Sequence, residues 1–276
     1  MKQWLNLSGK FIEERTPIIV ADNRALKYGD GLFETMRVVL GKIRLKDLHF
    51  KRLFDGMETL KISLNGTADP KILEQQVLKT VLKNNINGPA RVRLMVFRGN
   101  GGLQDFSTRG AGYIIQVWPL SSSKLMLNNE GLSLGIYEAG RKACDQFANL
   151  KSNNYLLYAM GALYAREQGW HDCLMLNTHD RITDTTIANL FWVKDGKVHT
   201  PPLSEGCVAG VMRAHLISRL AEEGRPVLEQ PATAADLTDA DEIFLTNAIQ
   251  GLRWVGSFNG KTFGNQLCSQ LFNATI

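Results

Sequence analysis

The sequence predicts an α+β protein of two domains. Segments that resemble strands and helices alternate from the start of the chain, and its 276 residues can form two hydrophobic cores. A Pro- and Ser-rich segment at 117–124, VWPLSSSK, interrupts this pattern and is typical of a linker. We therefore expect a small α+β N-terminal domain at 1–118 and a larger C-terminal domain at 119–276.

Strands are expected first in the N-terminal domain. Residues 10–14 and 33–39 have the apolar composition of strands, and Gly41-Lys42 favours a turn toward Ile43. The segment 90–97, ARVRLMVF, alternates apolar and basic side chains, which indicates a strand with one buried face. A Gly-rich loop, RGNGGLQDFSTRG, should connect it to a further strand at 112–118.

Two helices are expected between these strands. From Asp47 onward large apolar side chains recur on one helical stripe, at Phe50, Leu53, Phe54, Met57 and Leu60. Asp69 and Pro70 suit the N-cap and first position of a second helix, which should end near Asn85.

The C-terminal domain should hold a mixed sheet. We expect strands at 132–137, 173–177 and 189–193, the last followed by a tight turn at 194–197. A polar loop leads to Lys151, a helix should run from Asn154 to Gln168 and stop at Gly169, and another helix should begin near Val211.

Composition and charge restrict the possible functions. Hydrophobic residues make up 44% of the chain and charged residues 21%, and no apolar run approaches the roughly 18 residues of a membrane span. The N-terminus lacks a signal-peptide core, which indicates a soluble, cytoplasmic protein without a membrane partner. The net charge of +5 is scattered, which suits small anions better than nucleic acid. The widely spaced cysteines are interpreted as reduced packing residues, without a metal: Cys144, Cys173, Cys207 and Cys268.

Two residues could carry chemistry. Lys151, in NLKSNNYLLYAM, precedes a predicted helix; a buried lysine there could form an imine with an aldehyde cofactor, although a solvated loop lysine is the simpler alternative. Asp184, in RITDTTIANLFWV, could keep the pyridine nitrogen of pyridoxal 5'-phosphate (PLP) protonated, or could simply cap a turn.

Two further features could bind phosphate. The segment GCVAGVMRAHL places a glycine before a helix, whose first N–H groups and dipole favour an anion. Arg52 lies on the polar side of the first predicted helix, where it could face solvent or make a bidentate contact to a phosphate.

The order and spacing of these features resemble the class IV aminotransferase family. The similarity runs from about Asn6 to Val255, through ALKYGDGLFETMRVVLGKIRLKDLHFKRL and the long segment that begins with LKSNNYLLYAM. The family includes branched-chain aminotransferases, D-amino-acid aminotransferases and 4-amino-4-deoxychorismate lyases. The resemblance implies the two-domain fold type IV, which is D-amino-acid aminotransferase-like, with PLP between the domains and a homodimeric assembly.

The resemblance also implies roles for individual residues. Lys151 matches the Schiff-base lysine of a K-x-x-N pattern completed by Asn154, and would act as the proton shuttle. The residues implied in binding the phosphate or the ring are Arg52, Tyr155, Asp184, Val211 and Met212. Two positions depart from the family pattern. Asp184 stands where a glutamate, whose side chain is one methylene longer, is usual. Ala248 stands where several members have a phosphate-binding threonine, and its backbone N–H could still bind the cofactor.

The resemblance favours a lyase over a transaminase. In the R-V-R segment Arg91 replaces the tyrosine of branched-chain enzymes while Arg93 is kept, and the following loop lacks the histidine of D-amino-acid enzymes. FRGNGGLQDFS and TNAIQGL resemble lyase segments. The expected reaction converts 4-amino-4-deoxychorismate to 4-aminobenzoate and pyruvate, for folate biosynthesis. A transaminase acting with 2-oxoglutarate and a non-catalytic PLP-binding protein remain alternatives. Candidate substrate-binding residues are Phe33, Arg91, Arg93, Arg98 and Asn247.

Overall fold

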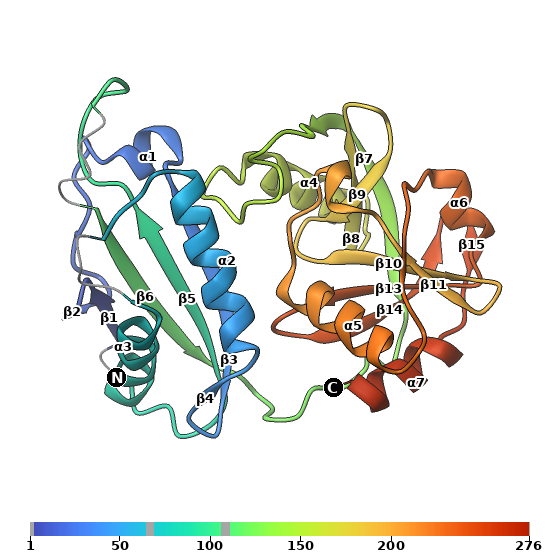
Figure 1. The fold of residues 1–276 in the computed structure, drawn as a ribbon, viewed down its shortest axis with the longest axis horizontal. Coiled ribbons are helices and arrows are strands. Elements are labelled where there is room, and N and C mark those ends of the chain that lie inside the picture. Colours follow the sequence, from blue (N-terminus) through green and yellow to red (C-terminus); the bar gives the residue numbers. More distant parts are fainter. Residues whose placement is uncertain (1–2, 65–68, 106–110, 276) are drawn as a thin grey trace. The chain divides into compact units, whose positions relative to one another are not determined.

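The computed structural model describes residues 3–64, 69–105 and 111–275, and the chain divides into two compact units. The first contains Met1–Lys124 together with Lys151–Tyr155, and the second contains Leu125–Leu150 and Leu156–Ile276. Both units combine sheets with helices, so the predicted α+β class is confirmed (Figure 1). Part of the predicted Gly-rich loop, 106–110, lies outside the described residues.

The first unit is built on an antiparallel sheet. In the described part of the chain this sheet has six strands in the order β2-β1-β6-β5-β3-β4. Their bounds are β1 Trp4–Leu7, β2 Lys10–Glu13, β3 Gly31–Val39, β4 Lys42–Ile43, β5 Ala90–Phe97 and β6 Gly112–Pro119. The long central strands pair over their full length, with Phe33 opposite Met95 and Met95 opposite Ile114. The strands predicted at 33–39, 90–97 and 112–118 are thus confirmed.

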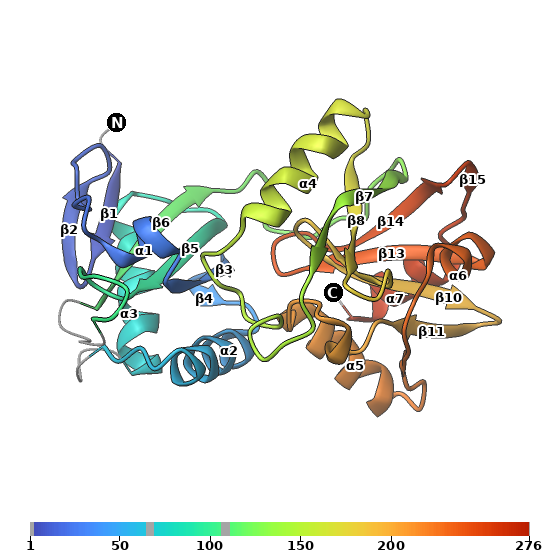
Figure 2. The same cartoon turned by 90° about the horizontal axis from the view of Figure 1, so that it is seen from above.

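Two long helices cover one face of this sheet (Figures 1 and 2). Helix α2, Lys46–Thr59, lies against β3, and α3, Pro70–Lys83, lies against β1, β5 and β6. The apolar stripe of α2 is buried at Phe50, Leu53 and Met57, as its spacing predicts. The Asp69 side chain accepts the Ile72 N–H at 2.7 Å, which confirms the predicted N-cap. A short helix that the sequence did not predict, α1 Arg24–Tyr28, precedes β3.

The segment around Lys151 belongs to the first unit because its backbone pairs with β3. Phe33 N–H donates to Lys151 C=O, and Asn153 N–H donates to Gly31 C=O, both at 2.9 Å. The expected boundary at 118/119 and the expected placement of Lys151 in the C-terminal domain therefore differ from the structure. Helix α4, Leu156–Glu167, begins two residues later than predicted because this pairing occupies the preceding backbone.

The second unit contains a mixed sheet that closes on itself. Its path in the described residues is β12-β11-β10-β13-β14-β7-β8-β9, and β9 also pairs with β10. Strand β7 runs parallel to both β8 and β14, which confirms the predicted mixed sheet. The bounds are β7 Leu132–Lys142, β8 Asp172–Asn177, β9 Ile182–Thr185, β10 Asn189–Lys194, β11 Lys197–Thr200, β12 Leu228–Glu229, β13 Glu242–Asn247, β14 Gly251–Phe258 and β15 Lys261–Thr262, which pairs with β14.

Strand β7 is longer than the sequence predicts. Its pairing with β8 shifts register between Tyr137 and Arg141, and the strand then continues to Lys142. This irregularity breaks the period-two alternation, so the sequence suggested a loop after Tyr137. The extra residues bring Lys142 opposite Asn177, at the end of β8.

Helices pack around the closed sheet. Helix α4 lies against β7 and β8, α5 Val211–Glu222 lies against β13, and α7 Gln266–Thr275 lies against β13 and β14. A short helix, α6 Ala234–Asp239, begins with a capping box at Thr233. None of the helices in the described ranges has the length and apolar character that crossing a bilayer requires.

The four cysteines are free, and three of them pack as expected: Cys173, Cys207 and Cys268 are buried. Burial raises the pKa of Cys173 to about 12, so its thiol stays protonated at neutral pH. Cys144 is exposed, and its interpretation as a packing residue is wrong, because it follows the last residues of β7 rather than lying inside the sheet.

Candidate functional site

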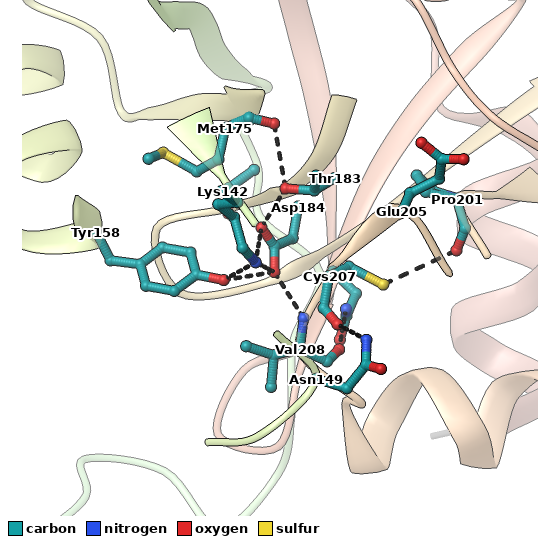
Figure 3. A network of polar contacts seen from close by, with 12 residues as sticks. Lys142, Asn149, Tyr158, Met175, Thr183, Asp184, Pro201, Glu205, Cys207 and Val208 are labelled. Carbon is teal, nitrogen blue, oxygen red and sulfur yellow. Dashed lines mark hydrogen bonds and ion pairs between the residues drawn. The ribbon is translucent and has the colours of Figure 1, made fainter. Parts of the chain in front are cut away.

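A buried polar network of the second unit centres on the carboxylate of Asp184, a candidate residue (Figure 3). Asp184 lies in β9 and is 2% exposed. Lys142 Nζ lies 3.1 and 3.0 Å from its two oxygens, and the Tyr158 hydroxyl donates to Oδ2 at 2.8 Å. The Thr183 hydroxyl reaches Oδ1 at 2.7 Å and Val208 N–H reaches Oδ2 at 2.9 Å. Lys142 Nζ also donates to the Tyr158 hydroxyl.

These contacts hold the loop that precedes α5. Val208 N–H binds Asp184, and Val208 C=O accepts the Asn189 side-chain amide at 2.8 Å. Asn149 holds the same loop by two bonds. Its side-chain amide donates to the carbonyl of Cys207 at 2.7 Å, and its backbone carbonyl accepts the N–H of Ala209 at 3.0 Å. The loop therefore has a fixed path between β9, β10 and the segment before Lys151.

A glycine completes this arrangement at Gly210, the N-cap of α5. A Cβ there would lie 1.8 Å from Asn189 Oδ1, so any other residue would force the Asn189 side chain away from its bond to Val208. Val211 and Met212 follow as the first helical residues, whose N–H groups have no acceptor within the helix. The predicted helix start after a glycine is confirmed. This helix start suits a phosphate because its N–H groups and the helix dipole favour an anion.

In the first unit, Lys151 lies beside aromatic rings. Its Nζ is 4.4 Å from the centroid of the Phe33 ring and 5.4 Å from that of Tyr155. The two rings meet edge to face, with centroids 5.4 Å apart and planes at 75°. Phe33 is buried, so the lysine amine has an apolar neighbour on a rigid strand.

A second cation contacts the same ring. Arg93 Cζ lies 4.1 Å from the Phe33 centroid, and its buried Nε lacks a hydrogen-bond partner in the described part of the chain. Burial, and to a lesser degree the charge of Arg91, lowers the pKa of Arg93 from its usual value. Arg91 is exposed and stacks on Trp118 at 5.4 Å. Lys151 and Arg93 thus place two cationic groups around one aromatic ring.

Arg52 is held by a buried carboxylate that the sequence analysis missed. Glu34 accepts Arg52 Nε at 2.7 Å and the same guanidinium's Nη2 at 2.6 Å, and His49 Nδ1 lies 2.6 Å from Glu34. Burial raises the pKa of Glu34, but the charges and hydrogen bonds of Arg52 and His49 outweigh it and lower the pKa from 4.5 to about 2. The bidentate ion pair fixes the orientation of the arginine.

The remaining candidates serve turns or ion pairs. Arg98 donates through Nε to Asp30 at 2.8 Å and through its other nitrogens to the carbonyls of Lys61 and Leu60, which favours a structural role. Asn247 accepts the N–H groups of Ile249 and Gln250 at 3.0 and 2.8 Å, so it shapes the turn between β13 and β14. Ala248 lies in that turn.

Sequence reasoning missed Glu34, His49, Lys142 and Tyr158 as partners of the candidate residues. Glu34 gave a usable signal: a carboxylate within the apolar strand GLFETMRVV must find a buried partner, and His49 and Arg52 lie three residues apart on one helix face. Lys142 and Tyr158 gave none, because they lie 42 and 26 residues from Asp184 and come from different elements.

Comparison with known proteins agrees with the resemblance found in the sequence. The profile of the amino-transferase class IV family matches residues 31–258. A Methanocaldococcus jannaschii protein provisionally named a branched-chain-amino-acid aminotransferase is 30% identical over 272 residues, covering 98% of this chain and 92% of the relative. The aminodeoxychorismate lyase of Vibrio harveyi is 30% identical over 233 residues, covering 83% of each chain.

A solved structure shares the fold closely. A Legionella pneumophila protein provisionally named a 4-amino-4-deoxychorismate lyase superposes with a TM-score of 0.85 at 28% identity, covering 94% of this chain and 95% of its own. Relatives of similar likeness therefore carry both names, and the fold type IV architecture is common to them.

The first prediction concerns Glu34→Gln. Since the folded pKa of Glu34 is about 2 against an ordinary 4.5, the unfolded chain binds the additional proton between these values. The ionised pair therefore stabilises the fold fully above about pH 4.5, and this contribution is lost as the pH falls toward 2. At pH 7 we expect Glu34→Gln to lose about 2 to 3 kcal/mol of unfolding free energy, because the variant removes the buried carboxylate charge that binds both Arg52 and His49.

Denaturant unfolding at pH 7 and in an acid series measures this effect, and the difference from wild type should shrink below pH 4.5. Glu74→Gln is the matched control: its pair with Lys46 is partly exposed, so its removal should cost under about 1 kcal/mol. Equal losses in the two variants would contradict a stabilising role for the buried pair.

The second prediction concerns Gly210→Ala. The added methyl would overlap the Asn189 side chain, so either that side chain leaves Val208 or the loop before α5 moves, and we expect a loss of about 1 to 3 kcal/mol of stability. If the start of α5 binds phosphate, PLP affinity in a spectroscopic titration should also fall at least tenfold. Gly264→Ala, where an added Cβ meets no atom within 4 Å, should change neither quantity. Unchanged PLP affinity in a destabilised Gly210→Ala protein would show that the phosphate binds elsewhere.

Proposed function

This chain belongs to the class IV aminotransferase family, and from this premise we propose that it is a lyase that converts 4-amino-4-deoxychorismate to 4-aminobenzoate and pyruvate. Its cofactor is pyridoxal 5'-phosphate, and its substrates are small amines, as in the family. The coarser assignment, a PLP-dependent class IV enzyme, holds for either reaction named among its relatives. The finer choice rests on the residues around Lys151.

The residues fit the cofactor in two respects. Lys151 supplies a primary amine that can form an imine with an aldehyde, in an apolar setting beside Phe33. The start of α5 offers backbone N–H groups after a glycine against which Asn189 packs closely, which is the form of a phosphate cradle. In the first unit, Glu34 holds the Arg52 guanidinium in one orientation, which suits a charge-assisted contact to a phosphate group.

The observation that carries the lyase proposal is Arg91, which stands where the branched-chain enzymes have a tyrosine; Arg93, the arginine that they share, is a candidate to bind a substrate carboxylate. The Arg93 guanidinium contacts Phe33, which also contacts Lys151, and its buried Nε has no partner among the described residues. A half-buried cation with an unused donor suits a substrate carboxylate. The carboxylate of an amino acid would satisfy the same donor, so Arg93 suits either reaction. Arg91, two residues earlier on the same face of β5, adds positive charge for an anionic substrate.

The proposed mechanism uses Lys151 as the base. Bound PLP supplies an electron-withdrawing ring that acidifies the C–H bond beside the substrate's amine nitrogen. Lys151 takes the proton from C4, the ring carbon that carries the amino group. The C3–O bond to the enolpyruvyl group then breaks as the ring becomes aromatic. Lys151 would then return this proton to the methylene carbon of the leaving enolpyruvate, which becomes pyruvate. Arg93 would hold a carboxylate of the substrate so that C4 faces the lysine.

A transaminase is the second candidate. Its support is the 30% identity to the archaeal branched-chain relative, which extends over 98% of this chain, together with the aromatic Tyr155 near Lys151. It would use an amino acid and 2-oxoglutarate in place of the single substrate of a lyase. The proposed cellular setting, a cytoplasmic homodimer that serves folate biosynthesis, follows from the lyase assignment and the family resemblance.

The third prediction concerns the cofactor lysine. Purified wild-type protein should be yellow, and Lys151→Ala should lose the visible absorption of the imine because no amine remains beside Phe33. Absorption spectra after dialysis against PLP-free buffer measure this. Lys197→Ala, which removes an exposed lysine of β11, should stay yellow. Equal colour in Lys151→Ala and wild type would assign the linkage to another lysine.

The fourth prediction separates the two reactions. Supplied with 4-amino-4-deoxychorismate and no keto acid, the enzyme should release 4-aminobenzoate and pyruvate over many turnovers, because a lyase regenerates its resting state in each cycle. Chromatography and a coupled pyruvate assay measure both products. In parallel, leucine, glutamate or D-alanine is supplied with 2-oxoglutarate. Sustained amino transfer without any 4-aminobenzoate would overturn the lyase proposal and leave the cofactor assignment in place.

A further inference from the structure

We infer that a row of arginines on the sheet of the first unit, Arg44, Arg37 and Arg91, recognises the second carboxylate of a substrate whose first carboxylate binds Arg93. The ligand is therefore a small ring compound that carries two carboxylates. The inference rests on the proposed lyase, whose substrate has one carboxylate on its ring and one on its enolpyruvyl group. It adds Arg37 and Arg44, which were not among the candidates from the sequence.

The row follows from the pairing of neighbouring strands. Arg37 of β3 lies directly opposite Arg91 of β5, and Arg91 lies opposite Trp118 of β6. On the other side of Arg37 the hairpin to β4 continues by one residue, because Arg44 N–H donates to Arg37 C=O at 2.9 Å. Residues directly opposite in an antiparallel pair share one face of the sheet, so these three arginines are neighbours there. Arg91 is exposed, which gives a ligand access to this end of the row.

The row shares its face with the proposed cofactor lysine. Side chains alternate along β3, so Arg37 is on the face of Phe33, whereas Glu34 points to α2. Arg93 and Lys151 both contact the Phe33 ring. The row lies two residues along β5 from Arg93, which corresponds to about 7 Å. This separation suits two carboxylates of one small molecule.

The arginines repel one another in this arrangement. Burial, and then the charge of Arg44, lowers the pKa of Arg37; burial, and then the charge of Arg91, lowers the pKa of Arg93. Arg37 is only 5% exposed, and its Nη2 donates to the carbonyl of Ser122. Like charges directly opposite each other destabilise a sheet, and a bound carboxylate would offset that cost. Guanidinium groups bind carboxylates in a planar, bidentate geometry.

Aromatic rings restrict the two arginines of β5. The Arg91 guanidinium lies 5.4 Å from the centroid of Trp118, and the Arg93 guanidinium lies 4.1 Å from that of Phe33. A cation held against an aromatic face has fewer orientations than a free arginine. Two oriented guanidinium groups therefore favour a ligand with a matching distance between its carboxylates.

The fifth prediction uses the holoenzyme and two probes that carry a hydroxyl group in place of the amine, so that neither can join the cofactor. Chorismate has both carboxylates, and 4-hydroxybenzoate has only the ring carboxylate. In isothermal titration calorimetry, wild type should bind chorismate about tenfold more tightly, which corresponds to about 1.4 kcal/mol. Arg37→Gln and Arg91→Gln should each remove most of this preference and leave 4-hydroxybenzoate binding unchanged. Arg93→Gln should weaken the binding of both probes.

Arg225→Gln is the matched control, because it removes an exposed arginine of the second unit and should alter neither affinity. If Arg37→Gln does not fold, Arg91→Gln decides the outcome, since Arg91 is exposed. Equal affinity of wild type for the two probes would overturn the inference. So would an equal loss of both probes in Arg37→Gln or Arg91→Gln, because the row would then not distinguish the second carboxylate.

Glutarate, an open-chain dicarboxylate, tests the ring of the ligand. It should bind more weakly than chorismate. Tighter binding of glutarate that depends on Arg37 would overturn the ring-bearing ligand and favour an open-chain keto acid. None of these titrations requires turnover, so an absence of lyase activity would count against the proposed function and leave the inferred carboxylate site to be judged by binding alone.

Discussion

The requirement that a buried carboxylate be fully paired shapes the second unit around Asp184. Its partners come from a strand, a helix, its own strand and the loop before α5, so one side chain ties four segments together. Through Val208 it also fixes the path of the chain into α5. Removing this charge would leave Lys142 buried without its ion-pair partner. The same residue that the family resemblance assigns to the cofactor is thus a centre of the protein's own polar packing.

The first unit uses the same principle on a single strand. Adjacent residues of β3 point to opposite faces of the sheet, so Glu34 meets His49 and Arg52 of α2 while Phe33 meets Lys151 and Arg93. The pairing of residues 151–153 with the start of β3 places the lysine beside that ring. A rigid central strand therefore orients both an arginine proposed to bind phosphate and the lysine proposed to carry the cofactor.

One fold serves two reactions among the relatives of this chain, so the fold cannot identify the reaction. The difference must lie in a few side chains that face the substrate. By the family resemblance Arg91 is the informative position, because it replaces a tyrosine, whereas the half-buried, unused donor of Arg93 suits a substrate carboxylate in either reaction. Arg98 shows why an arginine in a suggestive loop is weak evidence by itself, since it binds Asp30 and two carbonyls.

The sequence alone determined the α+β class, the principal helices and strands of the first unit, and the family, because periodicity, caps and motif spacing are local properties that a single chain displays. It also located Lys151, Arg52 and the glycine before α5, since each belongs to a contiguous motif. It could not show that residues 151–155 pair with β3, that β7 continues through an irregularity to Lys142, or that Lys142 and Tyr158 bind Asp184. These contacts join positions far apart in the chain, and only the packed tertiary structure decides which buried charge meets which partner.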